Sequence, residues 1–193
     1  MAEKYDVLIC SDEIHADILL EEEKKHLPLA SLKQKYSQRT ITLMGPTKAF
    51  NIAGLSISCS IIQNPELQKR MLEAARGILP DANCLAYLAA EAAYSKSESW
   101  LNANNAYLKG NRDCIYDFFL SHPDYELAYP LESTYLAWVK ALKIPADQLL
   151  KTFEAVGVGI SDGTQFHGPG FFRLNFGCSQ ALLKEGLRRI STI

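Results

Sequence analysis

Three short, mostly apolar runs lie near the start of the chain, at residues 5–10, 41–44 and 55–62. Runs of this kind are typical of strands buried on both faces, as in a largely parallel sheet. Asn64 and Pro65 end the third run, and the residues that follow predict a helix over 66–76 with Pro65 at its first turn. The pattern therefore predicts strand, loop, strand, loop, strand and helix, in that order.

Helical spacing of apolar residues dominates the middle of the chain and predicts two long helices within residues 83–120. Beyond His122 and Pro123, short strands alternate with turns at residues 125–129, 134–140, 157–161 and 171–176. Ser179 is placed to cap a final amphipathic helix. This change of texture predicts two domains, residues 1–109 and an α+β domain of residues 110–193.

Composition and charge exclude some classes of function. The chain has 193 residues, 48% of them hydrophobic, which is enough for a packed core. A formal net charge of -2 lacks the basic excess that favours nucleic-acid backbones, so no nucleic-acid partner is expected. No apolar stretch reaches the roughly 18 residues of a membrane span, and the first residues do not resemble a signal peptide. The five cysteines are scattered singly and form no metal-binding pattern, so we expect a soluble protein of the reducing cytoplasm.

One acidic residue stands where open α/β sheets bind their ligands. Asp12 follows the first predicted strand directly, and ligands of such sheets gather at the carboxyl ends of the strands. An acid at a strand end also serves simply to cap the next turn, and for an isolated residue this is the more common role. Asp12 is therefore a candidate that needs support from elsewhere in the chain.

A single lysine lies between the second and third predicted strands. Lys48 has small, aromatic and aliphatic neighbours, in the stretch GPTKAFNIAGL at residues 45–55. An ammonium buried in such surroundings tends to lose its proton, and the neutral amine is the form that makes Schiff bases. The alternative is an ordinary lysine in a surface loop, and this window alone does not separate the two.

A single arginine lies inside a predicted strand that is otherwise mostly apolar. Arg173 occupies the stretch GPGFFRLNFG at residues 168–177. The planar fork of arginine suits two-point capture of a carboxylate, and a buried arginine requires such a partner. A salt bridge to an acid of the same chain is the alternative, and for an isolated arginine it is the more common one.

Together the three windows resemble, in wording and order, the enzymes of pyridoxal-phosphate (PLP) fold type I, the class I/II aminotransferase superfamily. SDEIHAD is similar to that family's strand-end motif, PTKAFNIAGL to its PLP-lysine motif, and FFRLNFGCSQALLKEGLRRI to its substrate-carboxylate motif with the terminal helix. STYLAW and GVGISDG add resemblance to the small domain. The resemblance implies an α/β fold: the C-terminal part of the large-domain mixed sheet, followed by the α+β small domain.

Each matching position acquires an expected role from this resemblance. Asp12 would pair with the pyridine nitrogen of PLP, and Lys48 would form the Schiff base and then take up the Cα proton of an amino-acid substrate. Arg173 would hold the substrate carboxylate. His15 near the 3-oxygen and Thr47 near the phosphate are also implied, with less support, whereas His26, His122 and His167 match no catalytic position.

The resemblance is closest to the cystathionine β-lyase or cysteine-S-conjugate β-lyase group, of the maltose-regulon modulator type. His15 stands where aminotransferases commonly have tyrosine, and Ser56 where many have a phosphate-binding arginine, while Gly45 replaces a frequent serine. β-Elimination would then yield a thiol, pyruvate and ammonia. An aminotransferase remains the rival within the class, and a non-catalytic interaction or regulatory fragment is the rival from another class.

The family's chain is roughly twice as long, so the resemblance implies that its N-terminal half is missing here. That half normally supplies the phosphate-binding turn, the aromatic residue stacked on the cofactor ring and much of the dimer interface. A sheet divided in this way exposes strand edges and core surface that must be covered. We therefore expect a homodimer, or association with a chain that supplies the missing half.

Overall fold

The computed structural model describes residues 1–193, which form two compact units, Met1–Asn102 and Ala103–Ile193. The division falls within helix α4, Glu98–Ser121, and the boundary predicted between residues 109 and 110 falls within the same helix. No helix combines the length and the apolar character that crossing a membrane requires.

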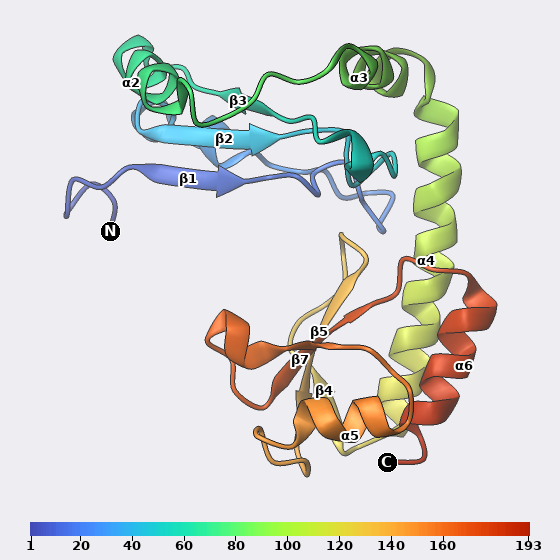
Figure 1. Ribbon diagram of the computed structural model, residues 1–193. Coiled ribbons are helices and arrows are strands. Elements are labelled where there is room, and N and C mark those ends of the chain that lie inside the picture. Colours follow the sequence, from blue (N-terminus) through green and yellow to red (C-terminus); the bar gives the residue numbers. More distant parts are fainter. The chain divides into compact units, whose positions relative to one another are not determined.

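The first unit is built on a three-stranded mixed sheet, in the order β1 (Ile9–Asp12), β2 (Thr40–Met44) and β3 (Cys59–Ile61). β1 and β2 are parallel, and β3 runs antiparallel to β2 (Figure 1). The expectation of a largely parallel sheet was therefore wrong for β3. A parallel neighbour needs a crossover, usually a helix, and between β2 and β3 the chain forms only turns and the short 3-10 helix η2 (Ala53–Leu55).

Side-chain caps mark the starts of two helices of this unit, α2 (Pro65–Ala75) and α3 (Cys84–Lys96). The shorter η1 (Leu29–Ser31) and α1 (Gln34–Ser37) have no side-chain cap. The Asn64 side-chain oxygen accepts hydrogen bonds from the backbone N–H groups of Glu66 and Leu67, at 3.0 and 3.2 Å. Pro65 occupies the first turn of α2, where its missing N–H costs nothing. The predicted start of this helix is confirmed.

Much apolar surface of the first unit is exposed. Every residue of β3 is exposed, so the expectation of a strand buried on both faces was wrong for β3. Helix α3 carries apolar residues on all sides but buries only Ala86 and Ala93, while Leu85, Tyr87 and Leu88 are exposed. A helix that is apolar all round is normally buried, so this surface has the character of an interior.

The second unit holds a four-stranded antiparallel sheet. Its order is β4 (Tyr125–Leu127), β5 (Leu136–Ala141), β7 (Phe171–Asn175) and β6 (Ser161–Asp162). β4 and β5 are consecutive in the chain, whereas the segment after β5 forms α5 (Leu149–Ala155) before returning as the edge strand β6. The 3-10 helix η3 (Gly163–Phe166) then leads into β7 (Figure 1).

One face of this sheet forms the core of the second unit. Ala137 and Val139 of β5 and Phe172 and Leu174 of β7 are buried, because side chains of a strand point alternately to its two faces. The amphipathic helix α6 (Gln180–Ile190), with its predicted cap at Ser179 confirmed, completes the unit. Arg173, between two buried neighbours, therefore faces away from the core.

Helices α4 and α6 lie side by side (Figure 1), and polar contacts fix their register. The Tyr107 hydroxyl accepts a hydrogen bond from the Gln180 backbone N–H at 2.8 Å. The buried Asn111 side-chain amide donates to the carbonyl oxygens of Phe176 and Cys178, at 2.9 and 2.8 Å. α4 thereby holds the segment that leaves β7.

Candidate functional site

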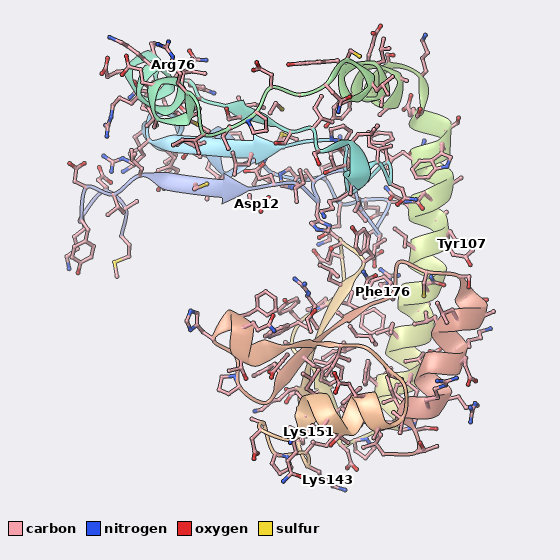
Figure 2. The ribbon with its side chains drawn as sticks, viewed as in Figure 1. Asp12, Arg76, Tyr107, Lys143, Lys151 and Phe176 are labelled. Atoms are coloured by element: carbon pink, nitrogen blue, oxygen red, sulfur yellow. The ribbon has the colours of Figure 1, made fainter.

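The carboxyl edge of the β1–β2 pair brings two predicted site segments together. Asp12 is the last residue of β1, at the tip of the strand (Figure 2), and pairs in register with Leu43 of β2. β2 ends at Met44, four residues before Lys48. Because parallel strands end at the same edge of a sheet, the loop after Asp12 and the turn that carries Lys48 leave from that edge.

Asp12 is exposed, and one of its two carboxylate oxygens is engaged. Its Oδ1 accepts a hydrogen bond from the Ile14 backbone N–H at 3.2 Å, which is the turn-capping role considered above. Its Oδ2 has no hydrogen-bond partner in the chain. The carboxylate is thus oriented by the turn and retains an oxygen for a further donor.

The next residue, Glu13, is buried and strongly hydrogen bonded, which the sequence did not suggest. Its carboxylate accepts hydrogen bonds from Ser11 Oγ at 2.9 Å and from the Leu29 backbone N–H at 3.0 Å, and lies 2.6 Å from His26 Nε2. Burial raises the pKa of Glu13, but the hydrogen bonds from His26, Leu29 and Ser11 outweigh it, and the pKa is lowered. Glu13 is therefore held as a carboxylate beside Asp12.

His15 and Thr47, the two less supported candidates, are both at this edge. His15 is half-buried in the turn after β1, and its carbonyl oxygen accepts a hydrogen bond from the Ile18 N–H at 3.0 Å. Thr47 is buried, and its carbonyl oxygen accepts from the Ile52 N–H at 3.1 Å. The first of these contacts shapes the turn after Asp12, and the second shapes the turn that carries Lys48.

The Lys48 side chain itself is exposed and has no ion-pair partner in the chain. Of the two alternatives for Lys48, the exposed lysine of a loop is therefore the one that the structure contains, because the turn projects the side chain outward while Thr47 and Ala49 on either side are buried. Gly45, at the start of this turn, is tightly enclosed. A Cβ there would lie 2.9 Å from the Ile57 carbonyl oxygen and 3.2 Å from Ile14 Cδ1. The site thus has no room for the serine frequent at this position in the family.

An aromatic cluster adjoins the lysine turn. Phe50, two residues after Lys48, stacks on Trp100 with ring centroids 6.2 Å apart and meets the ring of Tyr94 edge-on at 5.7 Å. Burial, together with the nearby Asp17 carboxylate, raises the pKa of Tyr94 to about 12. Its phenol therefore stays protonated at neutral pH, although Tyr94 and Trp100 are both exposed.

Arg173 of β7 is half-buried on the open face of the second unit's sheet. Its guanidinium carbon lies 4.7 Å from the centroid of the Phe166 ring, and Nη2 donates to Ser161 Oγ at 3.5 Å. No acidic side chain pairs with it, so the salt bridge considered as an alternative is absent. A guanidinium held over an aromatic ring without an anion has the chemistry of a carboxylate receptor.

Aromatic side chains that the sequence analysis did not assign surround this arginine. Trp138 lies opposite Arg173 in the β5–β7 register and stacks on Phe171, with centroids 5.5 Å apart and an interplanar angle of 7°. Phe166 meets Trp138 edge-on at 5.8 Å. Trp138 belongs to the STYLAW stretch and lies between Ala137 and Val139, which are buried. This alternation was the signal that could have placed Trp138 on the open face of the sheet.

Gly163 at the start of η3 fixes the loop that presents Phe166. A Cβ there would collide with the backbone oxygens of Gly168 and Phe171, which cannot move aside. We expect Gly163→Ala to lower the free energy of unfolding by about 1–3 kcal/mol, measured by urea denaturation. Gly159→Ala is the matched control, because nothing lies within 4 Å of its Cβ position. Equal stability of the two variants would contradict this close packing.

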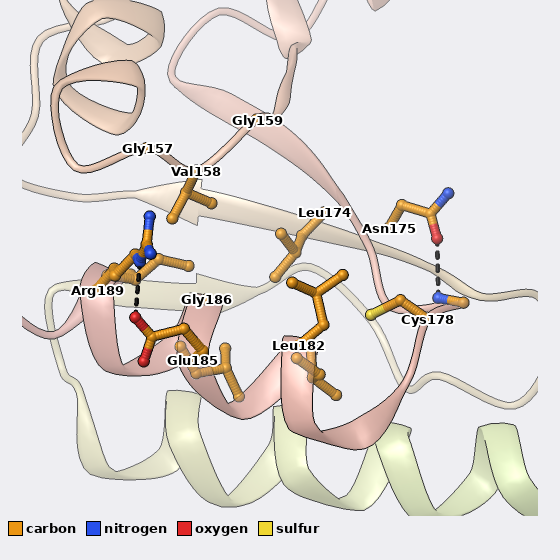
Figure 3. Close-up of a pocket in the computed structure, with 14 residues that line it drawn as sticks. Gly157, Val158, Gly159, Leu174, Asn175, Cys178, Leu182, Glu185, Gly186 and Arg189 are labelled. Atoms are coloured by element: carbon orange, nitrogen blue, oxygen red, sulfur yellow. Dashed lines mark hydrogen bonds and ion pairs between the residues drawn. The ribbon is translucent and has the colours of Figure 1, made fainter.

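A cavity of about 390 Å³ lies between α6 and the neighbouring loops of the second unit (Figure 3). Its walls include Val158, Leu174 and Leu183, and the ion pair of Glu185 and Arg189 lies at one side. None of the sequence-predicted site residues lines it. The cavity is therefore separate from the candidate site residues.

Comparisons with known proteins agree on one family. Residues 1–190 match the profile described as "Aminotransferase class I and II". Cystathionine beta-lyase PatB of Bacillus subtilis (strain 168) is 37% identical over 97% of this chain and 50% of its own length. The crystal structure of OvoB matches with a TM-score of 0.92 and 42% identity, over 99% of this chain and 50% of that one.

A third relative is a structure described as containing a pyridoxal 5'-phosphate cofactor. Cystalysin from Treponema denticola matches with a TM-score of 0.89 and 30% identity, over 99% of this chain and 50% of the cystalysin chain. The chain therefore spans about half the length of the relatives it matches.

Proposed function

Because the chain belongs to the aminotransferase class I and II family, we propose that it acts in a PLP-dependent carbon–sulfur lyase. The substrates would be cystathionine or other cysteine S-conjugates, and the products a thiol, pyruvate and ammonia. The observation that carries the proposal is the shared carboxyl edge of β1 and β2, from which both Asp12 and the Lys48 turn extend. The name of the PatB relative supports lyase chemistry over transamination.

The residues at this edge fit PLP, which supplies an electron sink when bound. Asp12 retains a free carboxylate oxygen for a protonated pyridine nitrogen, and Lys48 has an amine without a partner. His15 would lie near the 3-oxygen of the ring, and the Thr47 hydroxyl near the phosphate. The carboxylate, the amine and the hydroxyl thus match the pyridine nitrogen, the aldehyde and the phosphate of the cofactor, respectively.

The proposed reaction assigns two tasks to residues of this chain. The Lys48 amine takes the Cα proton of the bound amino acid, which requires the amine to be neutral when the substrate is in place. The Arg173 guanidinium binds the substrate carboxylate through two parallel N–H donors. Its lack of an acidic partner supports this role, since an arginine already paired would have to give up that bond first.

Transamination is the alternative within the same family, which carries that activity in its name. The two reactions differ in their requirements: β-elimination releases pyruvate without a keto-acid acceptor, whereas transamination stalls without one. Pyruvate production from S-methyl-L-cysteine in the absence of any keto acid distinguishes them. A non-catalytic role in binding another protein is the alternative from a different class.

We also propose that a partner chain covers the exposed apolar surface of the first unit, either a second copy or a chain with the other half of the family fold. The exposed residues of α3 and β3 support this, because monomeric proteins rarely leave large apolar patches uncovered. A reducing compartment such as the cytoplasm suits the chain, because Cys10, Cys59 and Cys84 are exposed free thiols.

An absorbance titration of the purified chain with PLP tests the proposed function. We expect wild type to develop the visible band of a protonated Schiff base and Lys48→Ala to lack it, because Lys48 lies in the turn that leaves the edge that holds Asp12. Lys33→Ala, which removes another exposed lysine of the same unit, is the control for random attachment and should retain the band. A folded wild-type chain without the band, or a band equally strong in Lys48→Ala, would contradict the proposal for this chain alone.

A further inference from the structure

We propose that Glu13 and His26 form a positioning pair that sets the direction of the Asp12 carboxylate. Neither residue has a role assigned by the motifs discussed above, and the pair would act through Asp12 without touching the cofactor. Only the purpose of the pair, which is to orient Asp12 toward the cofactor, rests on the proposed function. The hydrogen bonds through which the pair fixes Asp12, here called the clamp, belong to the chain without any cofactor.

The first step is the enclosure of the Glu13 carboxylate. Its side chain is 5% exposed, and its oxygens meet three donors from separate stretches of the chain: Ser11 of β1, His26 of the following loop and Leu29 of η1. A buried carboxylate is tolerated only when its oxygens are satisfied in this way. Glu13 therefore ties the loop of residues 26–29 back onto the end of β1.

The second step leads from Glu13 to Asp12. The Glu13 backbone N–H donates to the Leu43 carbonyl oxygen at 2.9 Å, which extends the β1–β2 pairing past Asp12. The Glu13 carbonyl oxygen accepts from the Ala16 N–H at 2.9 Å and closes the turn. Within that turn the Ile14 N–H donates to Asp12 Oδ1. Because the backbone of Glu13 is fixed by its side chain and by β2, the Ile14 N–H is aimed at Asp12.

The third step is the charge on the pair. The pKa of Glu13 is lowered, so the group contributes stability that is present above its unfolded pKa and is lost as the pH falls through its folded pKa. His26 also faces the Asp17 carboxyl, whose pKa burial raises while His26 opposes that change. Protonation of Glu13 would weaken its bond to His26, and the clamp would loosen on the acid side.

The test uses the full chain and measures the hydrogen bonds of the clamp in the absence of PLP. Amide hydrogen exchange of Ile14 reports on its bond to Asp12, and exchange of Leu29 reports on its bond to Glu13. We expect Glu13→Gln and His26→Asn to speed exchange at both amides by roughly tenfold while the strand amides of β2 stay protected. His26→Asn is the milder variant, since its side chain is 32% exposed. Glu23→Gln, an exposed acid in the same loop, is the control and should match wild type.

A second readout connects the clamp to function. At metal sites, mutating a residue that hydrogen-bonds to a metal ligand lowers metal affinity by roughly 10–100-fold. By analogy, we expect PLP affinity to fall by about tenfold in Glu13→Gln and in His26→Asn. The pH midpoint of the visible PLP band should move in both variants toward that of Asp12→Asn. A role confined to folding would leave this midpoint unchanged.

The outcomes separate the pair from the proposed function. Wild-type affinity and an unchanged band midpoint in both variants, with PLP bound, would overturn the positioning pair and leave the lyase proposal standing. Wild-type exchange at Ile14 in both variants would also overturn it. If wild type binds no PLP while Ile14 exchange rises in both variants, the proposed function fails and the clamp on Asp12 is upheld.

Discussion

Replacing Phe172 with alanine is expected to lower the free energy of unfolding of the second unit by about 3–5 kcal/mol. Phe172 is completely buried at the centre of β7. Its ring packs against Phe153 of α5 at 4.7 Å, against Tyr125 of β4 at 6.0 Å and against Phe119 of α4 at 6.4 Å between centroids. Removing one ring therefore leaves a cavity bounded by three elements that cannot all move inward.

Urea denaturation followed by near-ultraviolet circular dichroism measures this effect, since aromatic packing gives the signal. Phe171→Ala is the matched control: it deletes the same ring one position earlier in the strand, on the open face of the sheet. We expect this control to cost about 1 kcal/mol, because a half-exposed ring leaves no closed cavity. Equal losses in the two variants would contradict the assignment of the core to the Phe172 face.

Features of the fold that depend on residues close together in the sequence could be predicted from the sequence directly. Asn64 with Pro65 and Ser179 mark helix starts because a side-chain oxygen reaches N–H groups only two or three residues away. The alternation along β5 and β7 likewise follows from local geometry. These signals act over a few residues, so no knowledge of the tertiary fold is needed to use them.

Features that depend on distant partners were not predictable in the same way. The direction of β3 follows from the path of the chain between residues 45 and 58, and an apolar run has the same composition in either direction. The pairing of Glu13 with His26 spans 13 positions and carries no motif of its own. The exposure of Lys48 was left open, because apolar neighbours in sequence do not establish which side chains a turn directs outward.

The candidate site was predicted from the wording and order of its three motifs along the chain, not from any single residue. Asp12, Lys48 and Arg173 each had a common structural explanation. The structure contains the one proposed for Asp12, a cap on the next turn, and the one proposed for Lys48, an exposed side chain in a loop. For Arg173 the common explanation fails, since no acid pairs with it. That absence was not available from the sequence, because an ion pair depends on which residues meet in space.

Substitution of Arg173 is the second change with a large expected effect, a loss of carboxylate binding. We expect Arg173→Ala to weaken binding of S-methyl-L-cysteine by roughly 10- to 150-fold, because a hydrogen bond to a charged group contributes about 1.5–3 kcal/mol. Arg173→Lys should give an intermediate loss, since lysine keeps the charge but lacks the planar fork. Trp138, opposite Arg173 in the sheet, is the natural fluorescent reporter.

A Trp100→Phe background makes Trp138 the sole tryptophan, since the chain has 2. Lys140→Ala is the control, because Lys140 is a second cation on the same sheet, 5.8 Å from the centroid of the Phe171 ring. Loss of affinity in Arg173→Ala with retention in Lys140→Ala would assign the carboxylate to the guanidinium fork. Similar losses in both variants would mean that the sheet attracts anions only through its overall positive charge, and Arg173 would lose its special role.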